Sequence, residues 1–244
     1  MHFLKLADGK LNKLPISMIT ISHIFYNQHK MLSKHFEAWS KHPKNIFKYV
    51  IIDDCSPKRI SKTYKGDNLS IVRVKQNIPW NIAGARNLGF YVAPTEWVLG
   101  ADIDHVVTPE AAEQLLSLDL GNPNVAYIFS RVSSESNGYE GCPTIINILM
   151  NKNRFFEIGG YDEDFSGNYG KEETFFSHCF RRHSIKLIKC DNIVLNWYAD
   201  RGGTHGFKRD KTVNSKLYKS KMIELNAGTY RNGPIIRFKW NKIQ

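Results

Sequence analysis

Short apolar segments alternate with helix-like segments through the first half of the chain, and this alternation constrains the fold more than any other feature. Strand-like segments lie at residues 16–21, 49–53, 69–74 and 97–101. Helical spacing of apolar residues marks 28–41 and 83–93, and Thr108-Pro109 has the residue types that begin a third helix. Such alternation predicts an α/β fold with a mostly parallel central sheet flanked by helices.

Polar residues follow the predicted strands at the points where each strand ends. They are His23, Asp53, Asp54, Asp102 and Asp104. In open α/β sheets, ligands bind beyond the carboxyl ends of the strands. These residues therefore predict one shared site at that edge of the sheet.

The second half of the chain is less regular. Residues 125–131, 144–150, 185–189 and 193–197 indicate strands, 172–183 a helix, and 132–143 a polar loop. The 244 residues are enough for one domain, with a nucleotide-binding half at about 14–107, an acceptor-side subregion at about 108–206 and a basic extension at 207–244. The irregular spacing of Cys55, Cys142, Cys179 and Cys190 indicates reduced thiols rather than a disulfide framework.

Charge and hydropathy limit the environments that we expect. The net charge of +11 would attract anionic partners, and it leaves nucleic-acid binding open as a rival function. Acidic residues at the strand ends would repel nucleic-acid phosphates, so we expect no nucleic-acid partner. No apolar run is long enough to cross a bilayer, and residues 1–10 lack a secretory core. We therefore expect a cytoplasmic protein, with peripheral contact to anionic membrane left open.

Asp102 and Asp104 are the strongest local indication of chemistry. Residues two apart in extended chain project to the same side, so both carboxylates converge. Converging carboxylates repel each other unless a cation lies between them. Their hard oxygen atoms suit Mn²⁺ or Mg²⁺, which commonly complete their coordination with phosphate oxygens. Taken alone, the pair is also compatible with a solvated turn at a strand end.

Six segments resemble motifs of inverting GT-A glycosyltransferases of the family two type, with a galactosyltransferase-like second half. They are 16–23, 49–56 (Tyr-Val-Ile-Ile-Asp-Asp-Cys-Ser), 84–89 (Gly-Ala-Arg-Asn-Leu-Gly), 96–104, 159–165 (Gly-Gly-Tyr-Asp-Glu-Asp-Phe) and 170–175 (Gly-Lys-Glu-Glu-Thr-Phe). They occur in the family's order, and the resemblance as a whole spans about residues 16–205. The resemblance implies a GT-A fold and transfer of a sugar from a nucleoside-diphosphate sugar to an acceptor hydroxyl.

The resemblance also implies roles for particular residues. Asp53 or Asp54 would contact the nucleoside, and Arg86 the donor diphosphate or the Asp-x-Asp carboxylates. Asp104 would bind the metal directly, while Asp102 would contact ribose or a metal-bound water. The remaining donor-side candidates are His23, Trp80 and Asn87, although Trp80 is equally compatible with simple packing.

The acceptor side and the third metal ligand leave alternatives open. Glu173 resembles the base that deprotonates the acceptor hydroxyl, and Glu172 an acceptor-binding acid, although the family more often has Asp as the base. His205 resembles a further metal ligand, with His105 as the competing candidate. The acceptor class stays open between glycan, lipid-linked and protein-linked molecules. Two further alternatives are a donor-binding relative without turnover and a nucleotidyltransferase.

Overall fold

The computed structural model describes residues 3–5, 11–13, 19–61, 63–133, 140–199 and 207–244. Its elements are β1 (Phe3–Lys5), β2 (Leu11–Lys13), β3 (Ile19–Phe25), α1 (His29–Trp39), β4 (Phe47–Asp53), β5 (Leu69–Val74), α2 (Ile82–Val92), β6 (Trp97–Asp102), β7 (His105–Val106), α3 (Pro109–Leu115), β8 (Val125–Ser133), β9 (Glu140–Asn151), α4 (Lys152–Glu157), η1 (Glu163–Phe165), α5 (Glu172–Arg182), β10 (Lys186–Trp197), α6 (Thr212–Ala227) and β11 (Trp240–Lys242).

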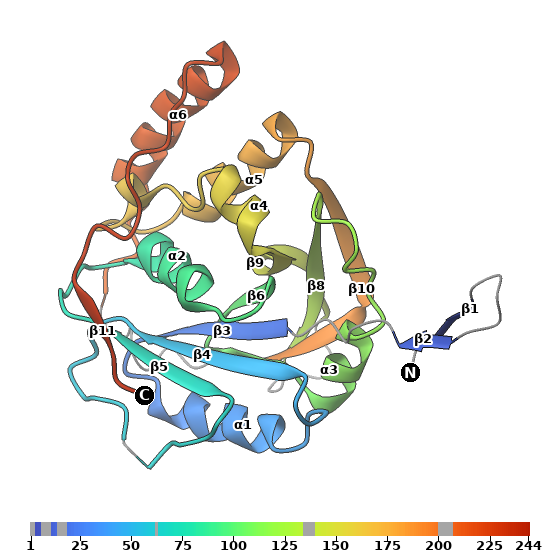
Figure 1. Cartoon of the computed structure of the whole chain (residues 1–244). Coiled ribbons are helices and arrows are strands. Elements are labelled where there is room, and N and C mark those ends of the chain that lie inside the picture. Colours follow the sequence, from blue (N-terminus) through green and yellow to red (C-terminus); the bar gives the residue numbers. More distant parts are fainter. Residues whose placement is uncertain (1–2, 6–10, 14–18, 62, 134–139, 200–206) are drawn as a thin grey trace.

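Within the described residues, nine strands form one mixed sheet with helices on both faces (Figure 1). Its order is β11-β5-β4-β3-β6-β9-β8-β10-β7, while β1 and β2 pair separately. The predicted α/β class with a flanked central sheet is confirmed. Strands β5, β4, β3 and β6 pair in parallel, and β8 pairs in parallel with β10.

The short connection between β8 and β9 makes these two strands pair antiparallel. Strand β9 starts at Glu140 and β8 ends at Ser133, so their connection is far shorter than the dozen or more residues of a parallel crossover. Strand β9 is accordingly antiparallel to β8. It is also antiparallel to β6 on its other side, and β11 is antiparallel to β5. The predicted strands at 185–189 and 193–197 are one strand, β10, with a shift of register between Cys190 and Val194.

Successive side chains of the parallel strands point to opposite faces of the sheet, so the apolar core lies in two parts, one on each face. In β3, Ile19, Ile21 and Phe25 join the apolar cluster that includes Met31 and Leu32 of α1. On the opposite face, α2 lies directly over the sheet, and a Cβ added at Gly89 would be 2.2 Å from the Ser22 hydroxyl oxygen. Figure 1 shows α1 and α3 on one side of the sheet and α2 and α4 on the other.

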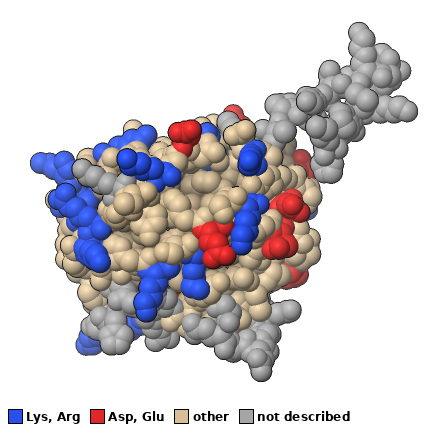
Figure 2. Space-filling model, turned by 90° about the horizontal axis from the view of Figure 1, so that it is seen from below, with Lys and Arg blue, Asp and Glu red and all other residues tan. Residues whose placement is uncertain are grey.

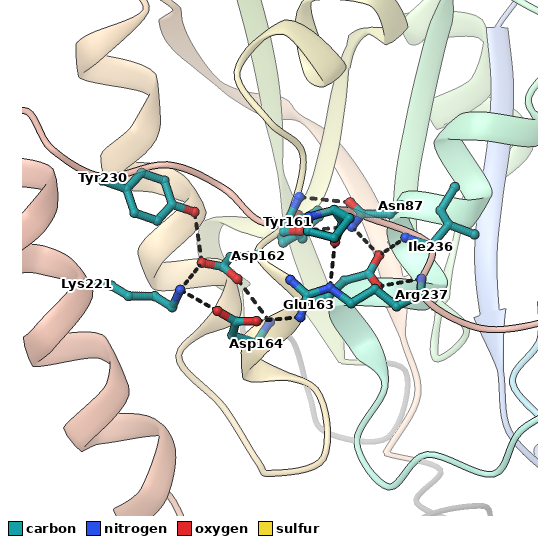
Figure 3. A network of polar contacts seen from close by, with 10 residues as sticks. Asn87, Tyr161, Asp162, Glu163, Asp164, Lys221, Tyr230, Ile236 and Arg237 are labelled. Atoms are coloured by element: carbon teal, nitrogen blue, oxygen red, sulfur yellow. Dashed lines mark hydrogen bonds and ion pairs between the residues drawn. The ribbon is translucent and has the colours of Figure 1, made fainter.

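The C-terminal extension is held on this second side by a polar network (Figure 3). Lys221 of α6 donates to Asp164 at 2.8 Å and lies 2.7 Å from Asp162, while the Tyr230 hydroxyl donates to Asp162 at 2.8 Å. Arg237 pairs with Asp164 on its other side. The basic extension, for which the sequence indicated no elements, is therefore anchored to the segment that precedes α5.

On the face seen in Figure 2, charged side chains are spread over the surface and do not form one patch. Lys and Arg side chains lie in several groups there, with acidic side chains among them. No helix among the described residues has the length and apolar character needed to span a membrane. Cys55, Cys179 and Cys190 are free thiols, as the cysteine spacing predicted for them.

Candidate functional site

A cavity of about 490 Å³ opens at the carboxyl edge of the parallel strands. Its lining contains seven of the residues that the sequence singled out: Asp54, Trp80, Asp102, Asp104, His105, Glu172 and Glu173. They come from the ends of β4 and β6, the turn before β7, the first residue of β7, the segment before α2 and the start of α5. Segments more than a hundred residues apart in sequence thus share one cavity.

Arg86 lies behind the cavity wall and joins two of its acids. Its guanidinium donates to Asp102 Oδ1 at 2.7 Å and lies 2.7 Å from Glu173 Oε1. The Tyr161 hydroxyl accepts a further bond at 3.3 Å. Burial by itself would lower the pKa of Arg86, but Glu173 and the other neighbouring groups raise it well above its ordinary value. Arg86 therefore stays charged, and it holds the two carboxylates close to each other.

The turn between β6 and β7 carries the second acid of the Asp-x-Asp pair. Asp104 Oδ1 accepts from His105 Nδ1 at 2.7 Å, and Asp104 Oδ2 accepts from Trp197 Nε1 at 3.2 Å. Ligand atoms of Asp102, Asp104 and His105 lie within 4.8 Å of one another. The two carboxylates supply the hard oxygen ligands that Mn²⁺ or Mg²⁺ take, so the residues present fit the ion that the sequence predicted.

His105 is better placed to orient Asp104 than to bind an ion itself. A carboxylate only accepts, so His105 Nδ1 carries the proton of their bond. Its Nε2 lies 3.2 Å from the Arg131 guanidinium, which can only donate. Both ring nitrogens are thus engaged, and the bond to Asp104 is of the kind that fixes a metal-binding carboxylate, since such carboxylates are themselves hydrogen-bonded. The competing candidate, His205, lies outside the described residues.

Glu172 and Glu173 occupy the first turn of α5, after two consecutive residues with left-handed backbone, Gly170 at φ +85° and Lys171 at φ +81°. Burial and the charge of Glu173 raise the pKa of Glu172 to about 7, and its Oε2 atom is buried with no hydrogen-bond partner among the described residues. Burial also raises the pKa of Glu173, whose side chain is 24% exposed. Both acids line the cavity, and Glu173 is the more exposed of the two.

Only one of the two acids after β4 faces the cavity. Asp53 is fully buried, pairs with Arg73 and accepts from the backbone N–H of Ser56 at 2.9 Å. Asp54 lines the cavity and accepts from the Asn81 amide at 2.9 Å. Burial, together with the charge of Asp53, raises the pKa of Asp54 to about 7. The two side chains diverge because Asp53 is the last residue of β4, whereas Asp54 follows the strand and leads into a turn in which Cys55 has φ +59°.

His23 and Asn87 were expected on the donor side, and the structure places both away from the cavity. His23 lies inside β3 rather than after it, on the α1 face, and is fully buried. Asn87 is fully buried, accepts from the Tyr161 N–H and donates to Glu163 at 2.8 Å. Successive helical residues point about 100° apart, so Asn87 cannot share the direction of Arg86. Neither residue lines the cavity, so the structure does not support the expected direct donor contact for either.

Trp80 lines the cavity, and the sequence did not predict which residues surround its ring. Its indole N–H donates to the Lys208 carbonyl at 3.2 Å, and its ring lies 4.7 Å from that of Tyr169 and 5.6 Å from that of Phe207. Arg209 lies 5.4 Å from the same ring. No spacing rule connects residues so far apart in sequence, and the same holds for the contacts of Trp197 and Arg131 described above.

The sheet order and its acidic edge correspond to the GT-A fold of glycosyltransferases. The TarS fragment 1–349 of S. aureus, solved with UDP-GlcNAc, superposes with a TM-score of 0.68 at 14% identity, covering 85% of this chain and 66% of the fragment. GalNAc-T7 with UDP, GalNAc and Mn²⁺ superposes with a TM-score of 0.68 at 13% identity, covering 96% and 55%. The mannosyltransferase PcManGT of Pyrobaculum calidifontis, solved with GDP-Man and Mn²⁺, gives 0.57 at 14%, covering 88% and 65%.

The family follows from the sequence itself. Residues 20–186 match the model of glycosyl transferase family 2, and the chain belongs to that family. An uncharacterised glycosyltransferase of Haemophilus influenzae is 25% identical over 120 residues, which are 48% of this chain and 40% of that protein. The chain thus spans less than half of that relative and less than two thirds of each of the three solved chains.

Proposed function

We propose that this chain transfers a sugar from a nucleoside-diphosphate sugar to an acceptor hydroxyl, with inversion at the anomeric carbon and dependence on Mn²⁺ or Mg²⁺. One observation carries the proposal: Arg86 binds Asp102 and Glu173 at the same time. This arrangement brings an acid of the expected metal site and the expected base to one wall of one cavity. Relatives of the same fold have been solved with UDP-GlcNAc, with GDP-Man and Mn²⁺, and with UDP and Mn²⁺.

The donor would lie along the cavity from Asp54 to Asp104. Asp54, which faces the cavity, would accept hydrogen bonds from the nucleobase or ribose. Asp104 would hold the ion, with His105 and Trp197 orienting its carboxylate. Asp102 would contact the ribose or an ion-bound water, and His205 stays a prediction as a further ligand. When bound, the divalent ion supplies Lewis-acid neutralisation of the leaving diphosphate.

The acceptor would approach from the side of α5. Glu173 would take the proton of the attacking hydroxyl, because its side chain is exposed to the cavity. As the acceptor oxygen forms its bond to the anomeric carbon, the bond to the diphosphate oxygen breaks and that oxygen keeps the electron pair. Glu172, protonated up to about pH 7 because burial and Glu173 raise its pKa, would donate a hydrogen bond to the acceptor. Arg86 would keep Glu173 in place.

Binding comes first in the test, because the acceptor is unknown. A thermal-shift screen with UDP- and GDP-sugars should stabilise the chain only when Mn²⁺ is present, since a ligand of the folded state raises its stability by mass action. Asp104→Asn should lose this stabilisation, while the exposed control Asp191→Asn should keep it. Stabilisation by donor that is equal in EDTA would remove the metal from the proposal.

Turnover is then measured as donor hydrolysis and as transfer to glycan, lipid-linked and protein-linked acceptors. Glu173→Gln should lower transfer by a factor of about 100 or more, in keeping with the loss of a general base. Unchanged turnover in that variant, together with a large loss in Glu172→Gln, would move the base to Glu172. Donor binding without any turnover would instead identify an inactive relative.

A further inference from the structure

Three histidines lie beneath the turn that carries the Asp-x-Asp pair, on the face of the sheet opposite Arg86. We call His23, His35 and His42 the histidine group. They come from β3, from α1 and from the residues just after α1. All three are buried, and none lines the cavity. The sequence analysis gave no role to His35 or His42, it expected His23 at the donor, and the proposed reaction uses none of the three.

Each member of the histidine group bonds to the main chain of residues 101–107. His35 Nε2 lies 2.7 Å from the carbonyl oxygen of Ile103. His23 Nδ1 lies 3.2 Å from the carbonyl oxygen of Ala101 and 3.3 Å from that of Asp102. The third bond, from His42 Nε2, reaches the carbonyl oxygen of Val107 at 3.0 Å. The main chain is thus held before, within and after the turn.

These contacts determine which ring nitrogens carry protons. A carbonyl oxygen only accepts, so His23 Nδ1 and the Nε2 atoms of His35 and His42 must be N–H donors. The opposite nitrogens of His23 and His35 are buried and have no partner among the described residues. Burial lowers the pKa of His23 to about 4 and that of His35 well below its ordinary value. The rings are therefore neutral, with one donor each aimed at the turn.

Neutral donors suit this place for an electrostatic reason. Arg86, His105 and Trp197 hold the side chains of Asp102 and Asp104. The histidine group instead holds the main chain of the same turn, from the opposite face of the sheet. A lysine or arginine there would add a second positive charge to that of Arg86 beside the cation site and would weaken cation binding further. A neutral imidazole donates the same kind of hydrogen bond without that charge.

We propose that the histidine group positions the divalent-cation site, with His35 as its central member, by holding the carbonyl groups of the turn that carries Asp102 and Asp104. The proposal rests on the proposed function, since it names the support of the same site. These histidines touch neither donor nor ion, so they are positioning residues. Their loss should loosen the turn and lower its affinity for the ion.

The test compares two replacements of His35 in the full chain. His35→Phe keeps a ring to pack against His23 and Trp39, whose centroids lie 4.1 Å and 5.4 Å away, but it removes the donor. His35→Gln restores an N–H donor on a side chain of similar reach. The control is Ile71→Ala, a core truncation on the same face of the sheet but in β5. His42→Phe repeats the donor loss at the other end of the turn.

Two readouts are measured on each variant: Mn²⁺ affinity by electron paramagnetic resonance, and hydrogen exchange of the peptide containing residues 103–107. We expect the Mn²⁺ dissociation constant of His35→Phe to rise about tenfold, as for other losses of support around metal ligands. Amide exchange in the turn should accelerate in the same variant. His35→Gln and Ile71→Ala should stay within about threefold of the wild type in both readouts.

The outcomes separate this inference from the proposed function. Wild-type affinity and exchange in a folded His35→Phe variant would overturn the positioning role, and so would equal losses in His35→Phe and His35→Gln. If His35→Phe fails to fold, His42→Phe is judged by the same two criteria. If the wild type binds no Mn²⁺, the proposed metal dependence fails, while the exchange comparison still decides whether the histidine group holds the turn.

Discussion

Asn214 of α6 offers the most quantitative test of how the C-terminal extension supports the site. Its side chain is fully buried, and its Nδ2 atom lies 2.9 Å from the Phe165 and Asn168 carbonyl oxygens and 2.8 Å from that of Gly170. These three carbonyls belong to the segment that leads directly into Glu172. Regular secondary structure does not hold the end of this segment, where Gly170 and Lys171 have positive φ.

The change to test is Asn214→Leu, which keeps a branched side chain of similar size but donates nothing. Two N–H hydrogens serve the three carbonyls, and each buried hydrogen bond contributes about 1 kcal/mol net, so the loss is about 2 kcal/mol. In a chain of this size, that corresponds to a fall of about 4–8 °C in the midpoint of thermal unfolding. The matched control is Asn226→Leu, on the same helix but exposed.

Two measurements check this prediction. Thermal unfolding by circular dichroism should separate the two leucine variants by the amount above, because any gain in helix propensity is common to both. Once a transfer assay exists, kcat of Asn214→Leu should fall about tenfold or more through displacement of Glu173, while KM for the donor changes little. Midpoints within about 1 °C of each other would show that the bonds of Asn214 contribute nothing net.

Three further predictions concern single side chains. Arg73→Leu leaves the buried Asp53 carboxylate unpaired, so urea denaturation should show a loss of about 3–5 kcal/mol, and a loss below about 1 kcal/mol would contradict the pairing. Burial raises the pKa of Asp54 to about 7, so the contribution of its protonated form to stability is complete below about pH 4 and is lost as pH rises to about 7. Over that window, the unfolding free energy of Asp54→Asn should fall less steeply than that of the wild type, by up to about 1.4 kcal/mol per pH unit. Parallel curves for the two proteins would refute the pKa shift. Asp104→Asn should raise the Mn²⁺ dissociation constant at least tenfold by calorimetric titration, and unchanged binding would place the ion elsewhere.

Local sequence pattern predicted most of the elements because their causes are local. Residues 69–74 form β5 as expected, and the helix predicted at 83–93 is α2 at Ile82–Val92. Thr108 caps α3 by accepting from the Ala111 N–H, with Pro109 in the first turn. Apolar periodicity and capping chemistry act over a few residues, so a single sequence displays them directly.

The start of β3 and the tail of the chain were harder to predict. The strand expected at 16–21 is described from Ile19 and continues to Phe25, because His23 can replace an apolar residue where buried carbonyls accept its N–H. The extension after residue 206 contains α6 and β11, which are held by partners such as Asp162 and β5. Their stability comes from residues distant in sequence, so no local pattern indicates them.

The sequence by itself determined the α/β class, the family and the edge of the sheet where acids gather, because strand ends and motif order are properties of the chain's own pattern. Only the tertiary structure decided between neighbours: Asp54 rather than Asp53 faces the cavity, and Arg86 rather than Asn87 reaches Asp102. The reason is physical. Which way a side chain points depends on the phase of its helix, the turn at its strand end and the partners that packing supplies, and those partners come from other parts of the fold.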